Sequence, residues 1–133
     1  MPVEQIIDVV CGVIADEQGR VLACRRREGG HLPGKWEFPG GKIEANETAA
    51  SALVRELNEE LGIQVAVGAP LTPVEFPYDD RSIRLIAFLC QITVGEPTAI
   101  EHSEIRWCSR ETWWELDWAE ADIPILHELS ARS

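Results

Sequence analysis

The sequence predicts an α/β or α+β sandwich built on a mixed β-sheet. Two observations support this fold class. Apolar runs rich in Val, Ile and Leu are interleaved with a few helical segments, and several neighbouring runs are joined by short turns. A chain of 133 residues can bury one substantial core without disulfides, so we expect a single domain over residues 1–133.

The expected strands are apolar runs bounded by turn signals. The first two runs are separated by the turn-like DEQG, and the second is followed by the glycine-rich loop REGGHLPGKW at residues 27–36. Strands resume after the central helix. The expected strands cover residues 5–14, 21–25, 63–67, 71–76, 82–94 and 105–108.

Three helices are expected. The first covers ETAASALVRELNEEL, residues 47–61, and Gly62 follows it as the C′ glycine. Two short helices are expected in the tail, near residues 110–117 and 122–131. At 3.6 residues per turn, one apolar stripe of the first helix contains Ala50, Leu53, Val54, Leu57 and Leu61.

The net charge limits the classes of binding partner, and the spacing of the cysteines indicates their redox state. The formal charge is −11, and no basic stripe is present to neutralise phosphates, so we exclude duplex nucleic acid. A small polyphosphate fits if metal ions bring the positive charge. With no signal peptide and no apolar run of membrane-spanning length, we expect a soluble cytoplasmic protein that does not bind membranes. Buried free thiols are expected at Cys11, Cys24, Cys90 and Cys108.

The stretch RELNEELG crowds three carboxylates on one part of the first helix. Glu56, Glu59 and Glu60 share a narrow arc, and only the small side chains of Ala49 and Ala52 lie beside them. Like charges at these spacings cost a helix roughly 0.2–0.5 kcal/mol per pair, so a cation should offset them. Carboxylate oxygens suit a hard divalent ion such as Mg²⁺. Taken alone, these eight residues also fit a solvated helix face.

The segment around this stretch decides between the two interpretations. Residues 41–63, GKIEANETAASALVRELNEELGI, resemble the Nudix box of the Nudix hydrolases at every defining position, with the box glycine, four glutamates and REL at the required spacing. WEFPGGK, VLACRR and ADIPIL are similar to the MutT branch of that family. The resemblance implies a Nudix fold, an α/β/α sandwich with a mixed sheet in which the box forms a loop-helix-loop.

The same resemblance implies a reaction and a cofactor. MutT-type enzymes hydrolyse nucleoside triphosphates to nucleoside monophosphate and pyrophosphate with Mg²⁺, for which Mn²⁺ can substitute. By resemblance, the metal ligands are Glu56, Glu59, Glu60 and the backbone carbonyl of Gly40.

The resemblance gives further residues a role beside the metal. Glu47 takes a supporting role, and Arg55 pairs with a box carboxylate. Glu101 matches a further metal ligand or general base of MutT-type enzymes, with a solvated loop residue as the alternative. His102 is a neighbouring base candidate with a weaker case.

Four residues are expected to contact the nucleotide. Arg26 and Phe38 match an arginine near the nucleotide and an aromatic against the base, while a surface arginine and ordinary core are the alternatives. Arg81 is a weaker candidate near the entrance. Asp122 replaces an asparagine of the 8-oxo-dGTP enzymes. An ionised Asp accepts from guanine N1–H and the exocyclic amine, but it repels the cytosine ring acceptor unless something is protonated. Helix N-capping is its alternative role.

Three functions therefore stay open. The leading one is 8-oxo-dGTP-type sanitation of the nucleotide pool, which serves DNA repair. The second keeps the chemistry with CTP, 5-substituted dCTP or another nucleoside diphosphate derivative as substrate. The third, of another class, is a catalytically silent nucleotide- or base-recognition module, against which the four intact box glutamates count. The sequence fits a monomer or a homodimer equally well.

Overall fold

The computed structural model describes residues 5–78 and 81–132. Two short 3₁₀ helices, η1 (Trp113–Glu115) and η2 (Glu120–Asp122), accompany the regular elements. The strands and α-helices are β1 (Gln5–Ile14), β2 (Val21–Arg25), β3 (Trp36–Glu37), β4 (Gly40–Lys42), α1 (Ala49–Leu61), β5 (Gln64–Pro70), β6 (Val74–Tyr78), β7 (Arg81–Val94), β8 (Glu104–Cys108) and α2 (Ile123–Ala131).

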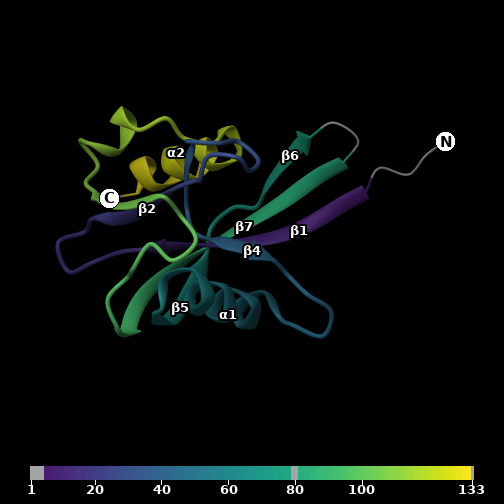
Figure 1. Ribbon diagram of the computed structural model, residues 1–133, viewed down its shortest axis with the longest axis horizontal. Helices are drawn as coiled ribbons and strands as arrows, with labels where there is room; N and C mark the ends of the chain where they lie inside the picture. The colour runs from purple at the N-terminus through teal and green to yellow at the C-terminus, as the bar shows by residue number, and fades with distance from the viewer. Residues whose placement is uncertain (1–4, 79–80, 133) are drawn as a thin grey trace.

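The strands form two sheets, and the larger one is mixed as predicted. Its order is β4-β1-β7-β5, with β6 also paired to β7. β1 and β7 run parallel in unbroken register from Gln5↔Arg81 to Ile14↔Cys90, whereas the other pairings are antiparallel. The smaller sheet has the order β3-β2-β8. Figure 1 shows α1 and α2 on opposite sides of the strands, so the predicted sandwich of helix, sheet and helix is confirmed.

Helix α1 starts and ends at well-defined caps. The Thr48 side chain accepts from the Ser51 backbone N–H, and the Ser51 hydroxyl accepts in return from the Thr48 N–H. Gly62 follows in the left-handed conformation, with φ 70°, and its N–H donates to the Asn58 carbonyl. The C′ glycine is confirmed, and the helix begins two residues later than the predicted Glu47.

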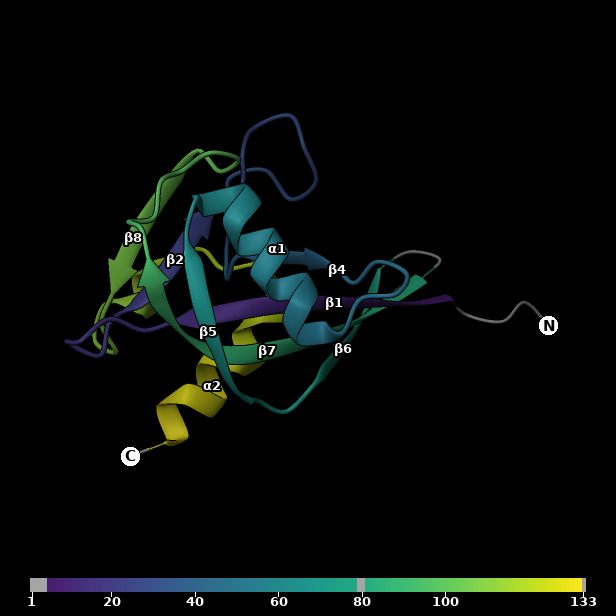
Figure 2. The ribbon, with the colours of Figure 1, turned by 90° about the horizontal axis from the view of Figure 1, so that it is seen from below.

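The buried face of α1 is rotated from the predicted stripe. Leu53, Leu57 and Leu61 of the predicted apolar stripe are buried, whereas Ala50 and Val54 are exposed. Ala52 and Glu60 are buried in their place. β4 packs beside α1 (Figure 2), and Gly41 of this strand lies against the carboxyl group of Glu56.

Apolar side chains fill both sides of the larger sheet. One cluster joins α1 to β1 and β5 through leucines and valines, and the other joins the sheet to α2 and to the tryptophans of the tail. All four cysteines are buried and free, as predicted. Among the described residues, no helix is long and apolar enough to cross a membrane.

Two predicted elements were wrong in place or type. The strand expected at 71–76 is β6, shifted to Val74–Tyr78, because the Leu71 N–H donates to the Ala87 carbonyl in a bulged connection. The helix expected at 110–117 is reduced to η1. Its turn is closed by Thr112, whose hydroxyl accepts from the Ser109 N–H, and side-chain hydrogen bonds of this kind compete with a continuing helix.

Replacing Leu57 by alanine tests the packing of α1 on the sheet. Leu57 is 0% exposed, so Leu57→Ala should lower the free energy of unfolding by about 2–5 kcal/mol through lost burial and the cavity left behind. Val54→Ala on the same helix is the control, because Val54 is 38% exposed and should change stability by only about 0.5 kcal/mol. Equal losses in urea denaturation would contradict this orientation of α1.

Candidate active site

Two glycines bring the β4 backbone against β1 and α1. A Cβ atom at Gly40 would overlap the Val10 carbonyl oxygen, and one at Gly41 would lie 2.5–2.7 Å from the carboxyl atoms of Glu56. The backbone contact excludes any side chain at Gly40, and a side chain at Gly41 would displace the Glu56 carboxyl group. The absence of side chains at Gly40 and Gly41 is therefore what lets Glu56 lie directly against the strand.

A cavity of about 290 Å³ opens beside this contact. Glu56, Glu60, Glu101 and Gly40 all line it, so four of the five predicted metal ligands share one space. Glu59 does not line it. Its side chain is 52% exposed and lies 3.4 Å from the Arg55 guanidinium. Within the described chain, no three His, Cys, Asp or Glu side chains are already arranged to hold an ion.

Arg55 holds the surrounding carboxylates in place. Its Nε donates to Glu47 at 2.7 Å and its Nη1 to Glu56 at 3.0 Å, so the predicted pairing with a box carboxylate is present. The Arg55 hydrogen bonds lower the pKa of Glu47 to about 2, and the same pairing raises the pKa of Arg55. Its guanidinium also donates to the Lys42 carbonyl, which ties the helix to β4.

Glu60 is a carboxyl group buried beside other carboxylates. It is 3% exposed, and His102 Nε2 lies 3.8 Å from its Oε1. Burial, followed by a hydrogen bond with Glu56, raises the pKa of Glu60 well above its usual range. A cation in the cavity would favour the ionised form, so this oxygen-rich site fits a hard divalent metal.

A chain of polar contacts that we did not predict from the sequence crosses the floor of the site. Arg26 Nη1 donates to Glu37 Oε1 at 2.8 Å, and Glu37 Oε2 lies 2.9 Å from His102 Nε2. His102 is buried, and its Nδ1 has no hydrogen-bond partner among the described residues. The position of Glu37 in WEFPGGK, between two buried aromatic residues, is the signal that could have identified it.

A second cavity of about 610 Å³ contains the predicted nucleotide-binding residues. Arg26, Phe38, Arg81 and Asp122 all line it, together with Tyr78 of β6. Phe38 is buried, with its ring 4.9 Å from that of Trp118, so it belongs to the core and to the cavity wall at once.

Asp122 is built into the wall of this larger cavity. Its Oδ2 accepts the Phe38 backbone N–H at 2.8 Å, and its side chain makes no capping bond to α2 although it precedes that helix. The N-cap alternative is therefore wrong for its side chain. Burial raises the pKa of Asp122 to about 8, against the opposing hydrogen bond from Phe38.

The two cavities share a wall. Arg26, His31, Glu37 and Gly40 line both of them, so the two cavities are direct neighbours. The larger cavity combines apolar walls with a few polar groups, which is typical of a pocket for a base, and the smaller one is lined by carboxylates.

Comparison with known proteins identifies the family. The NUDIX domain model matches residues 6–129. The chain belongs to the NUDIX family. It is 38% identical over 127 residues to a CTP pyrophosphohydrolase of Escherichia coli K12, an alignment that covers 96% of this chain and 93% of that protein. It is also 34% identical over 123 residues to an 8-oxo-dGTP diphosphatase of the same strain, covering 92% and 95%.

Solved structures support the same assignment. The solution structure of the E. coli ORF135 protein superposes with a TM-score of 0.84 at 36% identity, covering 98% of this chain and 94% of that one. The crystal structure of a MutT protein from Methanosarcina mazei Go1 gives 0.83 at 26% identity, covering 97% and 98%. The predicted resemblance is thus confirmed, and this NUDIX hydrolase belongs to a family whose members generally depend on divalent metals.

The Arg55 clamp predicts a change in one carboxyl pKa. In Arg55→Gln the pKa of Glu47 should rise from about 2 toward 4.5, measured by NMR titration of its carboxyl carbon. Because the folded pKa is depressed, the clamp contributes stability above pH 4.5 that is lost as the pH falls toward 2, and the variant should lack this contribution.

Arg20→Gln is the matched control, since Arg20 makes a similar 2.7 Å pair with Asp16 in the turn between β1 and β2. It should leave the Glu47 titration unchanged. A Glu47 pKa near 2 in Arg55→Gln would show that some other group holds this carboxylate ionised.

Proposed function

We propose that this NUDIX hydrolase converts nucleoside triphosphates to nucleoside monophosphate and pyrophosphate with Mg²⁺, or with Mn²⁺ as a substitute. The observation that carries the proposal is the shared wall between a cavity suited to a base and a cavity lined by carboxylates. A nucleotide spans such a pair of cavities with its base in the first and its phosphates in the second. The names of the two E. coli relatives support the same reaction class.

The carboxylates of α1 are proposed to hold the metal. Glu56 and Glu60 line the smaller cavity with the Gly40 backbone and Glu101, and Glu59 follows on the exposed side of the helix. When bound, the metal neutralises charge that develops on the phosphates and lowers the pKa of the attacking water.

The neighbouring residues are proposed to orient these ligands. Arg55 keeps Glu56 in position and Glu47 ionised. Glu101 stays the candidate for a further ligand or a general base, because it is exposed at the rim and can reach water.

Arg26 is proposed to bind the phosphate nearest the nucleoside. It lines both cavities, and Glu37 fixes its guanidinium through the 2.8 Å pair. A guanidinium held in one orientation offers its remaining N–H groups to phosphate oxygens at little entropic cost. Arg81, at the start of β7, lines the larger cavity alone.

We propose 8-oxo-dGTP as the leading substrate, with CTP or 5-substituted dCTP as the second. The environment of Asp122 favours the cytosine nucleotides. Its raised pKa keeps the carboxyl protonated at neutral pH, and a carboxylic acid can donate to the cytosine ring acceptor while it accepts from the exocyclic amine. This protonation removes the repulsion that counted against cytosine. Guanine-type bases can bind both the ionised and the protonated Asp122. The carboxylate accepts from N1–H and the exocyclic amine, and the neutral acid donates to O6 while it accepts from N1–H.

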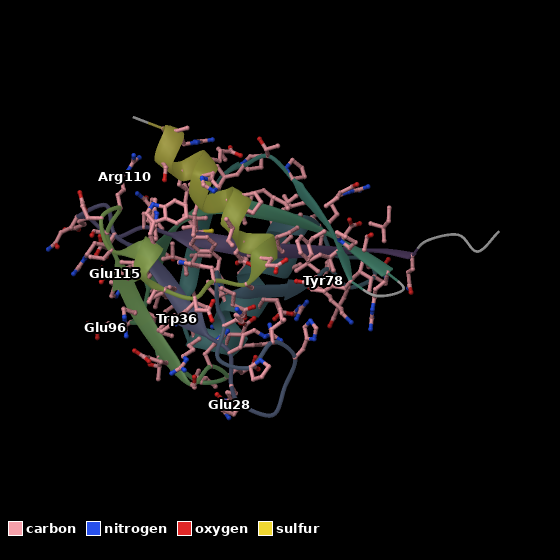
Figure 3. The ribbon with its side chains drawn as sticks, turned by 90° about the horizontal axis from the view of Figure 1, so that it is seen from above. Glu28, Trp36, Tyr78, Glu96, Arg110 and Glu115 are labelled. Atoms are coloured by element: carbon pink, nitrogen blue, oxygen red, sulfur yellow. The ribbon has the colours of Figure 1, made fainter. Side chains whose placement is uncertain are left out.

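Glu59→Gln tests whether the box glutamates act in catalysis. The metal-dependent kcat should fall by about a hundredfold or more, because one charged oxygen ligand is lost, while the thermal midpoint should hardly change at this half-exposed position. Glu96→Gln is the control. Figure 3 shows Glu96 far across the molecule from Tyr78 of the nucleotide cavity, and it lines neither cavity. Unchanged turnover in Glu59→Gln would refute the assignment of Glu59.

A panel of substrates turned over with Mg²⁺, with the products separated by chromatography, identifies the substrate class. We would compare kcat/KM for 8-oxo-dGTP, dGTP, CTP, 5-methyl-dCTP, ADP-ribose and diadenosine tetraphosphate, because discrimination between substrates is expressed in that ratio. A preference for 8-oxo-dGTP supports the leading function, and a preference for cytosine nucleotides supports the second. No turnover of any of them would revive the interpretation as a catalytically silent recognition module.

The pH dependence of the panel tests the role of Asp122. If cytosine is recognised through the protonated acid, kcat/KM for CTP should fall as the pH rises through about 8, whereas Asp122→Asn should remove this fall, because the amide does not titrate. The matching profile for 8-oxo-dGTP should be flat in this range, since both forms of Asp122 can accept from guanine N1–H. Parallel profiles for the two substrates would contradict this mode of recognition.

A further inference from the structure

Two arginines line the smaller cavity, which we call the carboxylate cavity, and only one of them is paired with a carboxylate. Arg26 is ion-paired with Glu37 at 2.8 Å, and its Nε donates to the His31 carbonyl. Arg27 donates from Nη2 to the Ile100 carbonyl at 2.8 Å and has no carboxylate within ion-pair distance among the described residues. A cation that lacks an anionic partner, at the rim of a cavity for phosphates, can bind an anion of the ligand.

The position of Arg27 indicates which phosphates it would meet. Arg26 and His31 line both cavities, whereas Arg27 lines only the carboxylate cavity. With the base in the larger cavity, the phosphate nearest the nucleoside lies at the shared wall beside Arg26. The phosphates farther along the chain then extend toward Arg27.

The guanidinium of Arg27 is also held in place. The Ile100 carbonyl accepts from Arg27, and the Ile100 N–H donates to the Glu60 carbonyl at 3.2 Å, near the end of α1. The loop after β2 is thereby connected to the helix that carries the box glutamates. One of the five guanidinium N–H groups is used in this contact, so the others can bind phosphate oxygens.

We propose that Arg27 binds the distal phosphates of the nucleotide and, after hydrolysis, the pyrophosphate product. This inference rests on the proposed function. It makes Arg27 the residue that distinguishes a triphosphate from shorter nucleotides, while Arg26 binds the phosphate that all of them share.

Three variants separate the charge of Arg27 from its structural contact. Arg27→Gln keeps an N–H donor for the Ile100 carbonyl but removes the charge, and Arg27→Lys keeps the charge. Arg25→Gln is the matched control. Arg25 is likewise exposed and likewise donates to a backbone carbonyl, that of Gly34 at 3.2 Å, but it lines neither cavity.

The measurements are KM and kcat with the best triphosphate of the panel, and product inhibition by pyrophosphate and by the nucleoside monophosphate. Arg27→Gln should raise KM and the inhibition constant of pyrophosphate by about tenfold, the typical effect of one charge-assisted contact. Its kcat and the inhibition constant of the monophosphate should change less than about twofold. Arg27→Lys should recover most of the loss, and Arg25→Gln should behave as wild type.

Two results would overturn the assignment. Equal changes for pyrophosphate and monophosphate, or none, would mean that Arg27 does not contact the distal phosphates. A fall in kcat alone would mean that Arg27 acts only by holding the loop that carries Glu101. Calorimetric titration of Mg²⁺-pyrophosphate into wild type and Arg27→Gln tests the contact without turnover, so a failure of the proposed function is distinguished from a failure of this inference.

Discussion

The close approach of the β4 backbone to β1 and to Glu56 is the constraint on which the site depends. Because Gly40 and Gly41 carry no side chain, the strand lies against the Val10 carbonyl on one side and against a helix carboxylate on the other. The backbone of Gly40 lines the smaller cavity together with Glu56 and the buried Glu60. The fold and the chemistry are therefore set by the same few backbone atoms.

The crowded negative charge is tolerated because each carboxylate is stabilised differently. Glu47 and Glu56 are held by Arg55, and Glu59 reaches solvent. Glu60 is buried beside other carboxyl groups, which raises its pKa, and a bound cation would favour its ionised form. Binding of a cation at this position would therefore be coupled to the release of a proton from Glu60.

The sequence predicted those elements and site residues that short stretches of the chain determine. The first two strands follow from their apolar runs, and the end of α1 follows from the capping glycine. The box carboxylates follow from the fixed spacing of the motif. Contacts between distant segments were not predictable in this way. The burial of Ala52 and Glu60, with Val54 exposed, depends on how α1 packs on β1, β4 and β5. The bond from the Phe38 N–H to Asp122 joins residues far apart in the chain. Likewise, the link between Glu37 and His102 exists only because β3 and the loop before β8 come together.

The parallel pairing of β1 with β7 has a consequence for how the chain folds. The first ten described residues find their partner strand only after more than half of the chain has been made. Pairing between segments so distant in sequence is slow, because the intervening chain must lose its freedom before the contact forms. During synthesis the edge of β1 that faces β7 therefore stays unpaired, while its other edge can already pair with β4. An apolar strand with one open edge can pair with another chain, so the segment that supports the glycine contact is exposed to aggregation in a nascent chain.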